Sequence, residues 1–197
     1  MIAGERVREG GRYHHRGRSC RGVLDAEKVI KMLTIVEGCV FLDLGCGDGF
    51  LSLAASAAVG SSGRVYALDV QREPLQALHR AVTERRIASV DPILGDAVLH
   101  LPLGDARVDL CLMANVFHGF HARKEVPGVM GEVARVLRPG GLAAVVDFKK
   151  EETPFGPPLR IRLYAEEIEE MMAPFGLRGE WIRDVGINHY LLLMVRV

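Results

Sequence analysis

Short apolar runs alternate with helical patterns through the middle of the chain. Strand-like runs fall at Val40–Leu44, Arg64–Leu68, Asp91–Leu94, Val108–Ala114 and Leu142–Asp147. Apolar positions recur at helical spacing over Asp25–Leu33, Gly49–Ala58, Pro74–Arg85 and Glu125–Leu137. Two of the runs, VDLCLMA and LAAVVD, are apolar on both faces, as a strand covered by helices on both sides requires. The alternation predicts a doubly wound α/β fold with a parallel sheet.

The pattern changes after the fifth strand-like run. A loop with three prolines, KKEETPFGPPLR, leads to a helix predicted over Ala165–Pro174. Two further runs, LRGEWIRDV and HYLLLMVRV, are joined by the turn residues Gly186–Asn188. Strands with so short a connection are antiparallel, so we expect a mostly parallel sheet that ends in an antiparallel hairpin.

The segment RVLRPGG connects the helix over Glu125–Leu137 to the strand that follows it. We expect Arg138 to close that helix and Pro139 to prevent its continuation. Gly140 and Gly141 would then make the turn into the fifth strand.

Charge divides the chain into two parts. The 197 residues have a formal net charge of +0 and a pI near 7.1, which argues against a dedicated nucleic-acid binder. Residues 1–22, however, hold six arginines against two glutamates, a local charge of +4, so residues 23–197 carry −4. We expect residues 1–22 to form a basic arm without a core of its own, followed by one domain over residues 23–197. The arm is either a flexible leader or a segment that folds over a ligand site and carries Tyr13, His14 and His15 to it.

Cysteine spacing and hydropathy exclude several other classes. The four cysteines form no C-x-x-C pair, so neither a zinc site nor a disulfide framework is indicated. No apolar stretch approaches the roughly 18 to 20 residues of a membrane span, and the N-terminus lacks the apolar region of a signal peptide. We expect a cytoplasmic protein, with its oligomeric state left open, a homodimer included.

A glycine-rich loop follows the first strand in VFLDLGCGDGFL. Gly45, Gly47 and Gly49 allow a tight turn into a helix whose first N–H groups can face a ligand. No lysine follows Gly49, which excludes a P-loop, and Phe50 stands where a dinucleotide fingerprint needs its third glycine. Asp43 places negative charge where a pyrophosphate would arrive, so a cationic ligand is favoured.

Two more acids follow the next two strands. Asp69 lies 20 residues beyond Gly49, where a carboxylate accepts hydrogen bonds from both hydroxyls of a ribose. Asp96 follows the third strand and can receive an adenine amino group. S-adenosylmethionine, with its sulfonium, ammonium and carboxylate, suits three acids that meet in one crevice beside a glycine loop.

The sequence resembles class I S-adenosylmethionine-dependent methyltransferases, in particular the small-molecule branch similar to ubiquinone/menaquinone biosynthesis C-methyltransferases. The resemblance rests on FLDLGCGDGF, VYALDV, GDAVLHLPL, VDLCLMANVFHGF and EVARVLRPGGLAAVVDFKKEE, and covers about residues 38–197. It implies a Rossmann-like seven-stranded sheet of order 3-2-1-4-5-7-6 with strand 7 antiparallel. It implies S-adenosylmethionine as cofactor, S-adenosylhomocysteine as product, and these cofactor-binding residues: Asp43, Gly45, Cys46, Gly47, Gly49, Asp69, Val70, Asp96, Ala97, Ala114 and Asn115.

The same resemblance places the loop after the fourth strand beside the transferred methyl group. His118 is the candidate there for a base or for orienting the acceptor, with capping or packing as the alternative. His118 and His121 can share a helical face, but two histidines without a third ligand do not indicate a metal. Other polar candidates for the acceptor side are His189, Tyr190, Lys149, Glu151 and Arg160.

The sequence indicates the chemical class of the methyl acceptor but not its identity. The residues MANVF stand where amino-methylating DNA enzymes carry an N/D-P-P-Y/F motif, so we expect a small molecule, with attack by carbon, nitrogen or oxygen open. The alternative is a non-catalytic binding protein of the same fold, whose arginine-rich arm contacts RNA or a protein partner.

Overall fold

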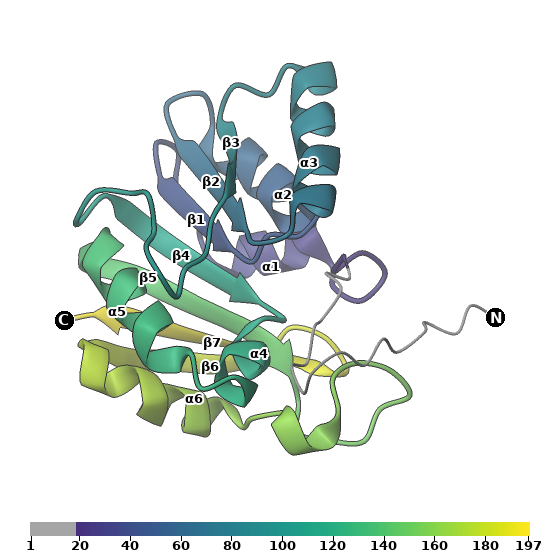
Figure 1. Ribbon diagram of the computed structural model, residues 1–197, viewed down its shortest axis with the longest axis vertical. Helices are drawn as coiled ribbons and strands as arrows, with labels where there is room; N and C mark the ends of the chain where they lie inside the picture. Colours follow the sequence, from purple (N-terminus) through teal and green to yellow (C-terminus); the bar gives the residue numbers. More distant parts are fainter. Residues whose placement is uncertain (1–18) are drawn as a thin grey trace.

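A seven-stranded sheet lies between two layers of helices in the computed structural model, which describes residues 19–197 (Figure 1). The strands are β1 (Val40–Leu44), β2 (Arg64–Asp69), β3 (Val90–Leu94), β4 (Val108–Ala114), β5 (Leu137–Phe148), β6 (Leu177–Asp184) and β7 (His189–Arg196). Their order is β3-β2-β1-β4-β5-β7-β6, and β7 runs antiparallel to both β5 and β6. The predicted fold class and strand order are therefore confirmed.

Helices cover both faces of the sheet and bury one apolar cluster on each. They are α1 (Ala26–Met32), α2 (Phe50–Val59), α3 (Arg72–Arg85), α4 (Phe117–Ala122), α5 (Val126–Val136) and α6 (Ala165–Met172), with 3₁₀ turns η1 (Leu159–Ile161) and η2 (Ala173–Phe175). Side chains of α1, α2 and α3 pack in one cluster, and those of α5 and α6 in the other. Asp25 caps α1, because its carboxylate accepts the Lys28 N–H at 3.1 Å.

The segment after α5 differs from the prediction. The helix ends at Val136, and Leu137 is already extended and paired with Val108 of β4. Arg138 therefore does not close the helix; its guanidinium instead pairs with Asp109 at 2.5 Å. The register jumps between Val108 and Leu110, so the four residues 138–141 bulge from β5 instead of turning into it.

Because β1, β2, β4 and β5 are parallel, their carboxyl ends lie at one edge of the sheet. The glycine loop, the residues after β4 and the loop after β5 all start from this edge (Figure 1). Among the described residues, no helix is long and apolar enough to cross a membrane.

Candidate cofactor and active site

The glycine loop is a tight turn that glycine adopts readily and other residues would strain. Gly45, Gly47 and Gly49 have φ of 78°, 55° and 73°, the left-handed region that side chains disfavour. A Cβ on Gly49 would lie 2.3 Å from Leu78, and one on Gly45 would lie 2.5 Å from Val116. The loop is therefore packed tightly between α3 and the segment after β4.

Hydrogen bonds tie this loop to the end of β2. The N–H groups of Gly45 and Cys46 donate to the Leu68 carbonyl at 2.7 and 3.0 Å. The Asp69 carboxylate accepts the N–H of Gly47 through Oδ2 and that of Gln71 through Oδ1, both at 2.8 Å. Each carboxylate oxygen keeps a further lone pair, so Asp69 can hold the loop and still accept hydroxyl groups of a ribose.

Asp43 lies underneath the loop. Its side chain is 2% exposed and accepts the Ser52 hydroxyl at 2.5 Å. Burial raises the pKa of this carboxyl to about 7, and the hydrogen bond from Ser52 limits the rise. Asp43 is thus a buried carboxyl whose charged form is disfavoured by its surroundings.

The predicted adenine side of the site is more open. Asp96 is exposed and accepts the Val98 N–H at 2.9 Å, while Ala97 is buried in the core. The Gly95 N–H donates to the Asp69 carbonyl at 3.1 Å, which keeps Asp96 beside the end of β2. Val70, next to Asp69, is 60% exposed at the same edge.

On the other side of the loop, Ala114 ends β4 and Asn115 follows with φ of 57°. The Asn115 N–H donates to Val146, and its side-chain amide donates to the Cys20 sulfur at 3.7 Å. Its Oδ1 is buried and has no hydrogen-bond partner among the described residues. A buried oxygen of this kind fits the ammonium group of S-adenosylmethionine, since such atoms normally have a donor.

His118, the candidate base, is held by a carboxylate that the sequence analysis did not single out. Its Nδ1 lies 2.8 Å from Oδ1 of Asp147, the next-to-last residue of β5. The same carboxylate accepts the backbone N–H groups of His118 and Phe148 at 3.1 and 2.8 Å. Because Asp147 acts as an acceptor in these bonds, we assign the imidazole proton to Nδ1.

Of the other polar candidates, Tyr190 and Lys149 have structural partners, Glu151 and Arg160 are exposed, and the buried Nε2 of His189 has no hydrogen-bond partner among the described residues. The Tyr190 hydroxyl donates to the Leu163 carbonyl at 3.0 Å, and Lys149 pairs with Asp184. His189 packs against the Phe148 ring, and burial lowers its pKa to about 4. His121 is exposed on α4, and no group of three possible metal ligands occurs within residues 19–197.

The described end of the predicted arm contacts the glycine loop. Ser19 and Arg21 both bind the Asp48 carboxylate at 3.0 Å, and the Arg21 guanidinium lies 5.0 Å from the centre of the Phe50 ring. Tyr13, His14 and His15 fall outside the described residues.

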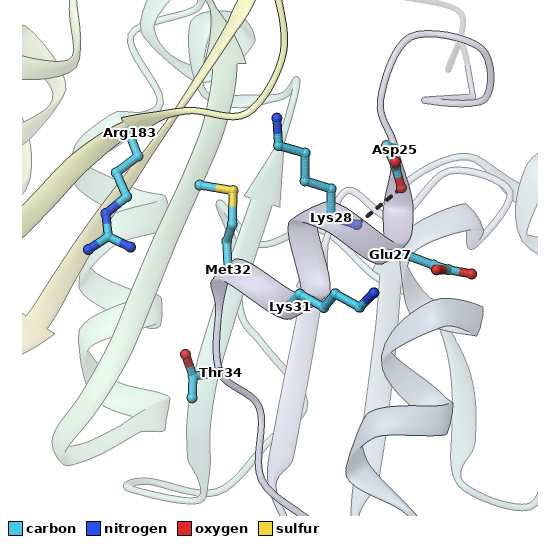
Figure 2. A pocket seen from close by; sticks show the side chains of 7 residues that line it. All are labelled: Asp25, Glu27, Lys28, Lys31, Met32, Thr34 and Arg183. Atoms are coloured by element: carbon cyan, nitrogen blue, oxygen red, sulfur yellow. Dashed lines mark hydrogen bonds between the residues drawn. The ribbon is translucent and has the colours of Figure 1, made fainter.

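A surface hollow of about 530 Å³ lies between α1 and the edge strand β6, away from these residues. Lys28 and Lys31 of α1 and Arg183 of β6 line it, with the acids Asp25 and Glu27 at one side (Figure 2). None of the predicted cofactor residues lines this hollow. Its lining mixes acidic and basic side chains, which does not indicate a particular class of ligand. The candidate site is therefore the carboxyl edge of the sheet.

Comparison with known proteins agrees with this assignment. The family described as "Methyltransferase domain" matches residues 41–141. The 2-phytyl-1,4-naphtoquinone methyltransferase of Nostoc punctiforme is 32% identical over 79% of this chain and 66% of its own length. The demethylmenaquinone methyltransferase of a Geobacillus species is 33% identical over 58% of this chain and 47% of its own. The chain thus spans about half to two thirds of these relatives.

A solved structure, a SAM-dependent methyltransferase from Aquifex aeolicus, superposes with a TM-score of 0.80 at 31% identity, covering 88% of this chain and 90% of that one. A putative type 11 methyltransferase from Sulfolobus solfataricus, 24% identical, shares the fold with a TM-score of 0.72 over 89% of this chain and 94% of its own. The chain belongs to the methyltransferase-domain family, among the class I proteins that use S-adenosylmethionine.

Two residues that hydrogen-bond to predicted site residues were not identified from the sequence. Asp147 ends an apolar strand in the same way as Asp69, and this signal could have identified it. Ser52, the partner of Asp43, is an ordinary helix residue whose role depends on the turn made by the glycine loop. No pattern in the sequence pointed to it.

We expect Asp69→Ala to weaken binding of S-adenosylhomocysteine by roughly 1 to 3 kcal/mol, because hydrogen bonds to the ribose are lost together with the anchor for Gly47. Titration calorimetry measures the change. Asp91→Ala is the matched control, since Asp91 pairs with Arg64 on the neighbouring strand. Equal affinity in the wild type and the Asp69 variant would show that Asp69 is not the ribose ligand.

Asp43 makes stability depend on pH. Its pKa is about 7 in the folded protein against an ordinary 3.8, so the folded state holds the proton more tightly. The free energy of unfolding should therefore fall as the pH rises from about 4 to 7, by on the order of 1–4 kcal/mol. Urea unfolding at pH 5 and pH 8 should show a smaller fall for Asp43→Asn than for the wild type; parallel changes would contradict the assignment.

Proposed function

We propose that this protein transfers a methyl group from S-adenosylmethionine to a ring carbon of a reduced naphthoquinone-type small molecule. The observation that carries the proposal is the His118–Asp147 pair at the carboxyl edge, three residues after Asn115. The names of the relatives support the choice of acceptor, since they are methyltransferases of a phytyl-naphthoquinone and of demethylmenaquinone.

The residues at the edge suit the cofactor. Asp69 would accept the ribose hydroxyls, and Asn115 Oδ1 would accept the ammonium group. N–H groups at the start of α2 would suit the carboxylate end of such a ligand, and Asp43, buried nearby, would complement its positive charge. When bound, S-adenosylmethionine supplies an electrophilic methyl group on a good leaving group, so alignment of the acceptor provides much of the rate.

His118 would act as the general base for the acceptor. With the Nδ1 proton donated to Asp147, Nε2 would take a hydroxyl proton from the quinol and raise the electron density of its ring. The ring carbon would then form the new C–C bond as the bond between the methyl group and sulfur breaks, and loss of that carbon's own proton to solvent would restore the hydroquinone. The Asp147 carboxylate stabilises the imidazolium that results. His118 is only 2% exposed, so contact with an acceptor requires the residues around it to move.

We expect His118→Ala to lower kcat by roughly 10²- to 10⁴-fold, the usual contribution of a general base. The assay follows labelled methyl transfer to an anaerobically reduced 2-prenyl-1,4-naphthoquinone with an open C3. His121→Ala, an exposed histidine of the same helix, should keep the wild-type rate, and S-adenosylhomocysteine should bind both variants with wild-type affinity.

Unchanged kcat in the His118 variant would exclude the base role. Wild-type protein that binds S-adenosylhomocysteine but transfers no methyl group to this quinol would exclude the proposed acceptor. Retention of RNA by the same protein, lost when residues 1–22 are deleted, would favour the non-catalytic alternative.

A further inference from the structure

A single buried arginine organises the irregular loop that follows β5. Arg162 is 4% exposed, and its guanidinium reaches back into residues 149–157. It donates to the carbonyls of Pro157 (2.8 Å), Glu151 (2.6 Å), Phe155 (3.1 Å) and Lys149 (3.3 Å) and to the Thr153 hydroxyl (2.7 Å). Five acceptors spread over nine residues of loop therefore converge on one side chain.

Only a guanidinium fits this arrangement. Its five N–H donors lie in one rigid plane, whereas a lysine ammonium offers three donors around a point. A buried charge is costly unless its hydrogen bonds are made, so the loop and the guanidinium stabilise each other. The stretch KKEETPFGPPLR is thus held in one conformation although it has little regular secondary structure.

The loop also packs against Phe148, the last residue of β5. The Arg162 guanidinium lies 5.0 Å from the centre of the Phe148 ring, and the Phe155 ring meets it edge-on at 6.0 Å. Gly156 has φ of 102°, and a Cβ there would lie 2.6 Å from the Phe148 ring. The loop therefore has a small aromatic core with room for no side chain at Gly156.

This anchored loop borders the pair that carries the proposed base. Phe148 directly follows Asp147, and the 3₁₀ turn η1 packs against α4, the helix of His118. Figure 1 shows the loop leaving the carboxyl end of β5, at the edge where the glycine loop also lies. Phe155 and Leu159 of this segment are 44% and 41% exposed, so they can offer apolar surface to a ligand.

We propose that Arg162 is a positioning residue for the methyl acceptor: it fixes loop 149–161 as the wall of the acceptor site beside His118, and thereby sets acceptor affinity without contacting the cofactor. The inference rests on the proposed function for the identity of the acceptor. It assigns to the loop an affinity for an apolar ring compound, which Phe155 and Leu159 would contact.

The test compares Arg162→Lys with Arg178→Lys, a matched change at an exposed arginine near the start of β6, outside the loop and away from the carboxyl edge. Both variants keep a positive charge and the same number of trypsin sites. In Arg162→Lys we expect KM for the reduced 2-prenyl-1,4-naphthoquinone to rise about 10-fold, with kcat altered less than threefold, because the loop loses several charge-assisted hydrogen bonds. Cleavage by trypsin between residues 149 and 161 should become faster, and affinity for S-adenosylhomocysteine should stay at the wild-type value.

A second variant tests the loop without touching the charge. Gly156→Ala forces a Cβ against Phe148, so it should raise KM in the same direction while Arg162 remains. This variant also tests the role of the loop if Arg162→Lys does not fold. Wild-type KM in the variant that folds, or a loss of S-adenosylhomocysteine affinity as large as the change in KM, would overturn the proposal.

Equilibrium binding of the same quinol to protein saturated with S-adenosylhomocysteine separates this inference from the proposed function. If the wild type binds the quinol but does not methylate it, the proposed reaction fails, and the weaker binding expected in Arg162→Lys still supports the loop. If Arg162→Lys binds the quinol as tightly as the wild type does, the role of Arg162 is contradicted whatever the turnover. Wild-type protein that does not bind the quinol would overturn both proposals.

Discussion

The site depends on carboxylates that satisfy backbone N–H groups where parallel strands end. At such an edge the chain leaves the sheet and its N–H groups lose their ladder partners, so each needs another acceptor. Asp69 accepts from Gly47 and Gln71, and Asp147 accepts from His118 and Phe148. The same acids carry the chemistry proposed for the edge, because the lone pairs left on Asp69 would suit ribose hydroxyls and Asp147 orients the His118 imidazole.

Burying these carboxylates costs solvation free energy, and the hydrogen bonds that offset this cost differ from one acid to the next. Asp43 is buried with one short hydrogen bond from Ser52, and its raised pKa reflects how poorly its charge is solvated. A cationic cofactor above the loop would restore part of the lost solvation. In the proposed site Asp43 would thus link cofactor charge to the stability of the glycine loop, whereas Asp69 holds that loop through a direct hydrogen bond to Gly47.

The fold could be predicted because its strands are buried on both faces and read as continuous apolar runs, as in β4 and most of β5. The prediction failed at Arg138, because a bulge depends on pairing with β4 and not on the local RPGG signal. His118 was found from its place after β4, but its partner Asp147 lies 29 residues further on and meets it only through strand pairing. Arg162 was missed because most of its hydrogen bonds go to backbone carbonyls of the loop. Every residue has a carbonyl, so no sequence pattern marks these acceptors.

We expect the carboxyl edge to bind an S-adenosyl cofactor and not a dinucleotide. Thermal unfolding of the wild-type chain with millimolar S-adenosylhomocysteine, or with NAD at the same concentration, tests it most directly. At about 100 times Kd a ligand adds about 2.7 kcal/mol, which raises Tm by several degrees in a chain of this size. We predict that rise with S-adenosylhomocysteine and none with NAD. No rise with S-adenosylhomocysteine, or an equal rise with NAD, would show that the carboxyl edge is not a selective S-adenosyl site.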